Sequence, residues 1–149
     1  MAAARLRGPH RAAGQRRARG PRGGHARVRV RHLEVSDTVG YLLEGPRRRA
    51  LFIPDTDAWS AWGRDIRGLV ESVDFAFLDA TFYSGAELPG RPPGEVPHPL
   101  VTDTLERLAG LGNRVQLIHL NHTNPLWEDP SPAVAHGFHV AQEGAAFEM

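Results

Sequence analysis

Two kinds of hydrophobic pattern alternate along the chain from Thr38 onward. Short apolar runs bounded by Gly, Pro or charged residues predict strands. The predicted strands are 38–43, 50–53, 75–78, 115–118 and 138–141, with a weaker one at 146–147. Apolar residues at helical spacing predict two amphipathic helices between them, at 59–73 with Asp57 as N-cap and at 100–111. This order of elements is typical of an α/β domain whose sheet is covered by helices.

Polar residues that could carry chemistry follow the predicted strands, where open α/β sheets place their sites. Asp55 and Asp57 come after the strand at 50–53; they could hold a divalent cation or cap a helix, and spacing alone favours the cap. Asp79 ends the strand at 75–78, and a buried carboxylate there would need a partner. His98 lies between two prolines, which by itself favours an ordinary loop histidine.

The densest polar group is the segment 117–125, LIHLNHTNP, in which His119 directly follows a predicted strand and His122 comes three residues later. Imidazole suits zinc, iron or manganese, and neighbouring amides can fix its tautomer. Because His-x-x-His is short and common, the pattern alone leaves a metal site and an ordinary turn equally open.

Composition narrows the choice of chemistry and location. A chain of 149 residues suits one domain with a real core. It has no cysteine, so a metal would be held by imidazole and carboxylate. The sequence contains no run of 18 apolar residues, which a membrane span would need, and no apolar segment near its start, which an export signal would need. We therefore expect a cytoplasmic protein without a membrane partner.

Charge is distributed unevenly between the start of the chain and the rest. Ten of the 18 basic residues lie at or before Arg31, and no acidic residue precedes Glu34. Residues 1–31 carry few large apolar side chains, which predicts a disordered leader. It could be an arm for nucleic acid or an anionic surface. The absence of aromatic residues among the arginines favours instead a solvated tail, or the product of a misplaced start or a frameshift.

Four segments together resemble consecutive blocks of one family. They are IPDTDAW at 53–59, LDATFY at 78–83, VPHPLV at 96–101 and LIHLNHTNP at 117–125. In this order and spacing they are similar to the metallo-β-lactamase-fold hydrolases akin to pyrroloquinoline-quinone synthesis protein B. The resemblance implies an α/β fold of the αββα type, of which residues 38–149 would form the C-terminal half, after a disordered leader at 1–31.

The resemblance also implies a metal site. Asp55 matches the aspartate that bridges two metal ions in this superfamily, and His119 matches its last metal-binding histidine. The expected cofactor is therefore a divalent metal, zinc in the first place, with iron or manganese as alternatives.

Four other residues match positions close to that site. His98 matches a histidine near the substrate in related nucleases, which implies a catalytic role. Asp79 matches an acidic position that is structural or supports the metal ligands. His122 and Asn124 belong to a block of the quinone-synthesis-like subgroup, and we interpret them as residues of the pocket or supports of the ligands.

One departure from the family limits the expected activity. The main metal motif, His-x-His-x-Asp-His, does not occur in the sequence, and His32 lacks the family pattern around it. We therefore expect a truncated, weakly active hydrolase with incomplete metal binding, a small-molecule substrate and an uncovered sheet face; a homo-oligomer stays open. The alternatives are a nucleic-acid-binding module that uses the basic arm and a non-catalytic interaction domain.

Overall fold

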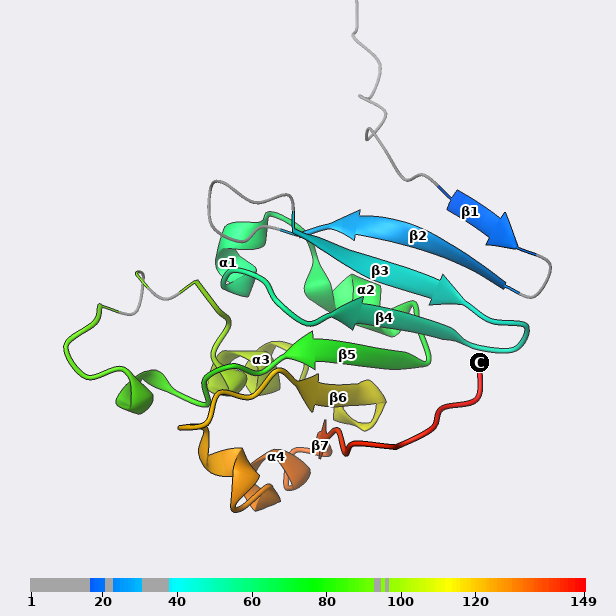
Figure 1. Cartoon of the computed structure of the whole chain (residues 1–149). Coiled ribbons are helices and arrows are strands. Elements are labelled where there is room, and N and C mark those ends of the chain that lie inside the picture. Colours follow the sequence, from blue (N-terminus) through cyan, green and yellow to red (C-terminus); the bar gives the residue numbers. More distant parts are fainter. Residues whose placement is uncertain (1–16, 21–22, 31–37, 93–94, 96) are drawn as a thin grey trace, which may run out of the picture.

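A single mixed sheet organises the part of the chain that the computed structural model describes, residues 17–20, 23–30, 38–92, 95 and 97–149 (Figure 1). Its strands are β1 Arg17–Gly20, β2 Gly23–Arg29, β3 Val39–Glu44, β4 Arg49–Ile53, β5 Phe75–Asp79, β6 Val115–Ile118 and β7 His139–Val140. They pair in the order of the sequence. β1 to β4 are antiparallel to one another, whereas β4 to β7 are parallel. The α/β fold class predicted from the sequence is confirmed.

The helices are short, and each of the four contributes at least one buried residue to the core beside the sheet. Figure 1 shows their arrangement around the sheet. They are α1 Trp59–Trp62, α2 Ile66–Glu71, α3 Val101–Arg107 and α4 Ser131–Val134, with 3₁₀ turns η1 Gly85–Glu87, η3 Gly112–Arg114 and η4 Pro125–Trp127. None of the helices in the described ranges is long and apolar enough to cross a membrane.

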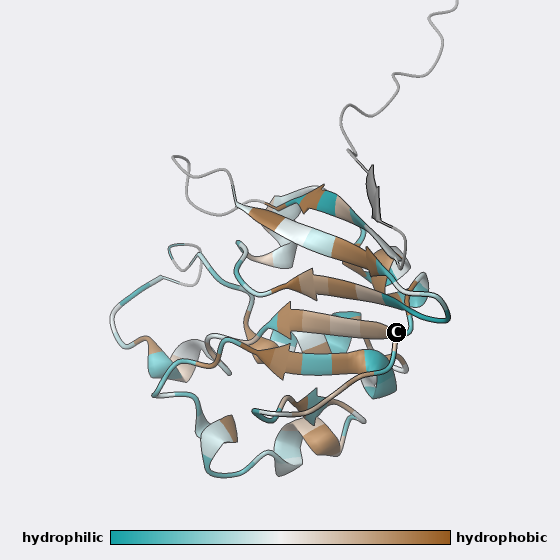
Figure 2. Cartoon of the chain, turned by 45° about the vertical axis from the view of Figure 1, so that its right-hand side comes forward, coloured by the Kyte–Doolittle hydropathy of each residue, from teal (hydrophilic) through white to brown (hydrophobic). Residues whose placement is uncertain are grey.

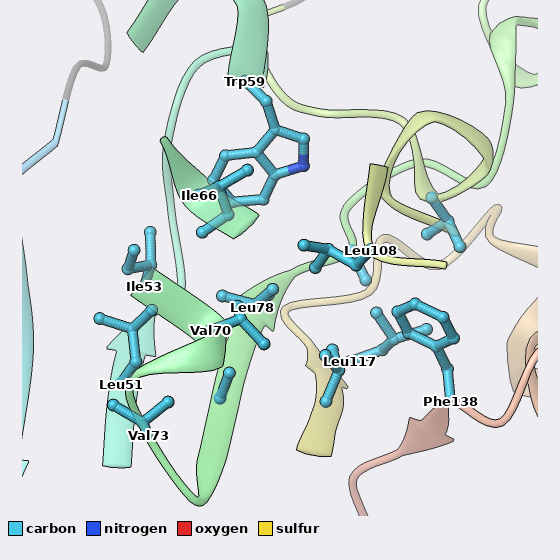
Figure 3. Close-up of a cluster of buried hydrophobic side chains, with 14 of the residues drawn as sticks. Leu51, Ile53, Trp59, Ile66, Val70, Val73, Leu78, Leu108, Leu117 and Phe138 are labelled. Atoms are coloured by element: carbon cyan, nitrogen blue, oxygen red, sulfur yellow. The ribbon is translucent and has the colours of Figure 1, made fainter. Parts of the chain in front are cut away.

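The core lies between the sheet and the helices. Alternate strand residues such as Leu51, Leu78 and Leu117 are fully buried and meet Val70 of α2 and Leu108 just after α3 (Figure 3). The apolar colouring of the central strands in Figure 2 shows the same concentration of hydrophobic residues. Burying one such side chain stabilises the fold by about 1.5–3 kcal/mol, so this layer supplies a rigid base for the strand ends.

The opposite face of the sheet is aromatic and partly covered by the C-terminal segment. Phe75 and Phe77 of β5 are half-buried there. The ring of Phe147 packs against both, at centroid distances of 5.1 Å. The prediction of a strand at 146–147 is wrong, because this segment is held by aromatic packing and forms no ladder.

The predicted helix at 59–73 is divided into two. Gly63 adopts a left-handed conformation (φ 68°) that ends α1, and α2 begins three residues later. The N-cap of α1 is Ala58, so the prediction that Asp57 caps this helix is also wrong. Asp55 does not cap α1 either, since no side chain donates or accepts a capping hydrogen bond at this helix start.

Part of the predicted disordered leader belongs to the sheet. The predicted disordered leader extends to Arg31, yet Gly23–Arg29 forms β2, which pairs with β3 along six residues. Ala26, Val28 and Val30 are only 3%, 2% and 5% exposed, because every second residue points into the core. β1 pairs with β2 in turn. The remaining leader residues, 1–16, 21–22 and 31, and also His32, lie outside the described residues.

We expect Val28→Ala to lower the free energy of unfolding by about 2 kcal/mol, because it removes two buried methyl groups and leaves space behind. Urea denaturation followed by circular dichroism measures this change. Arg27→Ala is the matched control on the exposed face of the same strand, with an expected effect within about 0.5 kcal/mol. Equal, negligible effects of both substitutions would show that β2 does not belong to the cooperative core.

Candidate metal centre

Four side chains that can bind a metal converge at one edge of the sheet. Asp55 follows β4, Asp79 ends β5, His98 lies in the loop before α3, and His119 follows β6. One potential ligand atom from each of them lies within 4.8 Å of the others. The group is at the carboxyl ends of β4, β5 and β6, on the left in Figure 1.

The parallel pairing of these three strands explains the convergence. Ile53 is in register with Leu78, and Asp79 is in register with Ile118. Strands that run side by side in the same direction end at the same edge, so residues just beyond their ends meet there. Asp55 and His119 therefore approach each other although 64 positions separate them in the sequence.

Asp79 is the fully buried centre of the group, and its carboxylate accepts four hydrogen bonds. Oδ2 accepts from the Thr56 amide at 3.1 Å and from His98 Nδ1 at 2.8 Å. Oδ1 accepts from the Thr81 amide at 2.9 Å and from the Thr81 hydroxyl at 2.7 Å. Burial by itself would raise the pKa of Asp79, but His119, His98 and Thr81 together outweigh it and hold this pKa below its ordinary value.

His98 is fixed by its loop and by two carboxylates. The Val101 amide donates to the Phe82 carbonyl at 2.9 Å, which ties the end of the loop to the segment after β5. The imidazole contacts the Phe82 ring edge-on at 5.9 Å. Its Nδ1 lies 2.8 Å from Asp79 and 3.6 Å from Asp55. Nδ1 therefore donates to Asp79, and Nε2 is the ring nitrogen that does not take part in this hydrogen bond.

His119 has an unusual backbone conformation for a residue with a side chain. Its φ is 62°, and it is the one non-glycine residue with a positive φ in the described ranges. Such a conformation is costly and tends to occur at functional sites. Nδ1 lies 3.1 Å from the Thr81 hydroxyl and 3.8 Å from Asp79, beyond direct hydrogen-bonding reach. The Asp79 carboxylate raises the pKa of His119 above its ordinary value, against the opposing effect of burial and with a contribution from Asp55.

The structure places the two remaining predicted residues outside this group. His122 is exposed in the loop after His119. Asn124 is 2% exposed and braces the chain after β5, donating from Nδ2 to the Ala80 carbonyl at 2.7 Å. It also accepts from the Leu126 amide at 3.0 Å and so caps η4. Asn124 thus supports the segment that carries Thr81.

Two imidazoles and two carboxylates form a donor set that suits zinc, iron or manganese. The structure therefore brings together four of the six residues for which the sequence predicted a metal, catalytic or supporting role, and leaves His122 and Asn124 outside the group; the individual roles stay predictions. The sequence reasoning missed Thr81, whose hydroxyl contacts three members of the group. An Asp-Ala-Thr sequence directly after an apolar strand was the available signal.

Comparisons with known proteins agree with this arrangement. Residues 12–120 match the family described as Beta-lactamase superfamily domain. The chain is 30% identical over 128 residues to coenzyme PQQ synthesis protein B of Rhizobium meliloti, covering 75% of this chain and 40% of that protein. The corresponding protein of Azotobacter vinelandii is 30% identical over 127 residues, with 76% and 41% covered. The chain thus spans about two fifths of the length of these curated relatives.

Two solved structures share the fold. Zn²⁺-bound PqqB from Methylobacterium extorquens superposes with a TM-score of 0.75 at 18% identity, covering 93% of this chain and 55% of that chain. A diphosphatase from the PhnP family gives a TM-score of 0.62 at 17% identity, with 91% and 46% covered. The fold and family predicted from the four sequence motifs are therefore confirmed: this chain belongs to the β-lactamase superfamily.

Proposed function

We propose that this chain carries part of the active site of a zinc-dependent hydrolase that acts on a small molecule. The observation that supports the proposal is the convergence of Asp55, Asp79, His98 and His119 within 4.8 Å at the carboxyl edge of the sheet. The zinc in the PqqB neighbour and the activity of the diphosphatase neighbour are consistent with it. A bound divalent ion would supply a water of lowered pKa and polarise a carbonyl or phosphoryl group.

The contacts suggest a division of roles within the group. Both oxygens of Asp79 already accept two hydrogen bonds each, and Nδ1 of His98 is directed to Asp79. Asp55 and His119 are more exposed, with 35% and 49% of their side chains accessible. They are the residues that would hold the metal.

Asp79 and His98 then act together in proton transfer, with His98 as the general acid. Asp79 orients the imidazole through Nδ1, so that Nε2 of His98 can give a proton to the leaving group as the scissile bond breaks. General acid catalysis by a positioned histidine contributes about 10²–10⁴-fold to a rate. Hydrolysis needs no further reactant, since water supplies the hydroxyl and the proton that the products carry.

The expected activity of these 149 residues alone is low. Catalytic zinc sites normally have three protein ligands and an open position, whereas the proposed roles leave two ligands among the described residues. A site with only two protein ligands binds the metal weakly, because water molecules compete with these ligands for it.

Zinc titration against a chromophoric chelator tests the proposal directly. We expect at most one Zn²⁺ per chain, with a Kd weaker than about 1 μM. Turnover of a small phosphodiester and of a small diphosphate should stay close to the background of a chelator-treated sample. Stoichiometric binding far tighter than this together with clear turnover would show that the chain assembles a complete site, whereas no binding at all would reject the metal centre.

A further inference from the structure

The Thr81 hydroxyl lies at the centre of the metal-ligating group without being a ligand candidate itself. Its Oγ1 is 2.7 Å from Asp79 Oδ1, 3.1 Å from His119 Nδ1 and 3.2 Å from His98 Nδ1. Thr81 is 7% exposed, so its own side chain is largely shielded from water. A hydroxyl has a single proton to donate but can accept two hydrogen bonds, which restricts how these three contacts can be arranged.

Asp79 determines where the hydroxyl proton goes. Oδ1 also accepts from the Thr81 amide and Oδ2 from the Thr56 amide, so both carboxyl oxygens act as acceptors and Thr81 donates its hydroxyl proton to Oδ1. The hydroxyl oxygen is then an acceptor for the two imidazoles. His98 has a closer acceptor in Asp79 Oδ2 at 2.8 Å, which leaves His119 to use the Thr81 oxygen as its main partner.

We propose that Thr81 is a positioning residue that fixes His119 as the Nδ1–H tautomer and thereby presents Nε2 as the metal-binding nitrogen. His119 Nδ1 donates to Thr81 Oγ1, and the Thr81 hydroxyl donates to Asp79 Oδ1. The buried carboxylate of Asp79 thus orients His119 through Thr81, although His119 lies beyond its direct hydrogen-bonding reach. Orientation of a metal-binding imidazole through its second nitrogen is a general requirement of such sites. The metal-binding part of this inference rests on the proposed function; the tautomer does not.

The backbone around Thr81 explains why its hydroxyl is held in place. The Thr81 amide donates to Asp79 Oδ1 at 2.9 Å, and its carbonyl accepts from the Asn121 amide at 3.0 Å. Asn124 holds the preceding carbonyl of Ala80. The Ala80 amide in turn donates to Ile118 at 2.9 Å, which ties this segment to the residue before His119. Thr81 and His119 are therefore fixed relative to each other by hydrogen bonds between backbone segments.

The experiment compares the wild-type chain with Thr81→Val, which keeps the shape and removes the hydroxyl, and Thr81→Ser, which keeps the hydroxyl. Nitrogen-15 chemical shifts of the His119 ring, measured without metal at alkaline pH where the imidazole is neutral, report the tautomer. We expect the Nδ1–H form to predominate in the wild type and in Thr81→Ser, and a mixture or the Nε2–H form in Thr81→Val. Backbone amide spectra verify that all three proteins are folded.

Zinc titration of the same proteins gives a second readout. Thr81→Val should weaken binding about 10–100-fold, and Thr81→Ser should restore it to within about threefold of the wild type. A wild-type Nε2–H tautomer, or the same tautomer distribution in a folded Thr81→Val, would overturn the inference. If no variant binds zinc while the tautomers differ as expected, the proposed function fails and the role of Thr81 in orienting His119 stands.

Discussion

Replacing Asp55 or His119 by alanine should weaken zinc binding by the chain more than about 100-fold, since loss of a residue that merely supports a ligand already costs about 10–100-fold. Each substitution removes one of the two donors that remain accessible in the group. Chelator competition measures the affinity, and circular dichroism verifies that each variant is folded. The expected result for both is binding below the detection limit.

His122→Ala is the matched control for His119→Ala. It removes an exposed imidazole from the same loop, outside the group of four. We expect a loss of no more than about tenfold, the lower end of the range for supporting residues. Equal losses in the two histidine variants would contradict the assignment of His119 as the ligand.

The affinity should also depend on pH in a defined direction. A histidine binds metal only when it is neutral, and the pKa of His119 lies above its ordinary value of 6.5. Zinc binding is therefore expected to weaken as the pH falls through this raised pKa, because protons compete for the ring.

Asp79→Asn should lower the free energy of unfolding by about 3 kcal/mol or more, because it leaves buried donors facing an amide that cannot accept all four hydrogen bonds. This is a large fraction of the 5–15 kcal/mol typical of a whole domain. Urea denaturation measures it, and the midpoint should fall by roughly 1–3 M. Asp103→Asn is the control, since its exposed pair with Arg107 at 2.8 Å is worth about 0.5 kcal/mol or less.

The pH dependence separates this electrostatic contribution from a general packing defect. The pKa of Asp79 is lowered in the folded chain, so its stabilising contribution is fully present above the ordinary value of 3.8 and is lost as the pH falls through the folded value. The difference in stability between wild type and Asp79→Asn should therefore shrink in acid. A difference that stays constant across this range would show that charge is not its cause.

Much of the fold could be predicted from the sequence because apolar periodicity reports directly on burial. The strands at 50–53, 75–78 and 115–118 were predicted within one residue of their observed bounds. β2 was not predicted, although Ala26, Val28 and Val30 alternate with arginines. The high positive charge of this segment was interpreted as disorder, and the alternation of apolar and polar residues that is typical of a strand was overlooked. The break at Gly63 was also missed, because the apolar spacing continues across it while the backbone does not.

From residue patterns alone, the candidate site could be predicted only for the residues that stand at the ends of strands. Parallel strands bring Asp55, Asp79 and His119 to one edge, and a strand order deduced from the sequence is enough to expect that. The position of His98 depends on a bridge between Phe82 and Leu100, and the ring of His119 is directed by a positive φ. Residue patterns along the chain do not report either feature. Only the family resemblance placed His98 near the site, and the contacts of the Thr81 hydroxyl with the group became visible in the structure.

The agreement between strand order and chain order has a consequence for biosynthesis. Each strand in the described sheet pairs with the one that precedes it, so a growing chain can add every new strand to an edge that already exists. Asp55, Asp79 and His98 are all synthesised before β6, but His119 follows that strand, and Ala141 still has to pair with Leu117 afterwards. His119, the last of the four donors, is therefore synthesised only after β1 to β6. A nascent chain cannot bring the four donors together around a metal ion before that point.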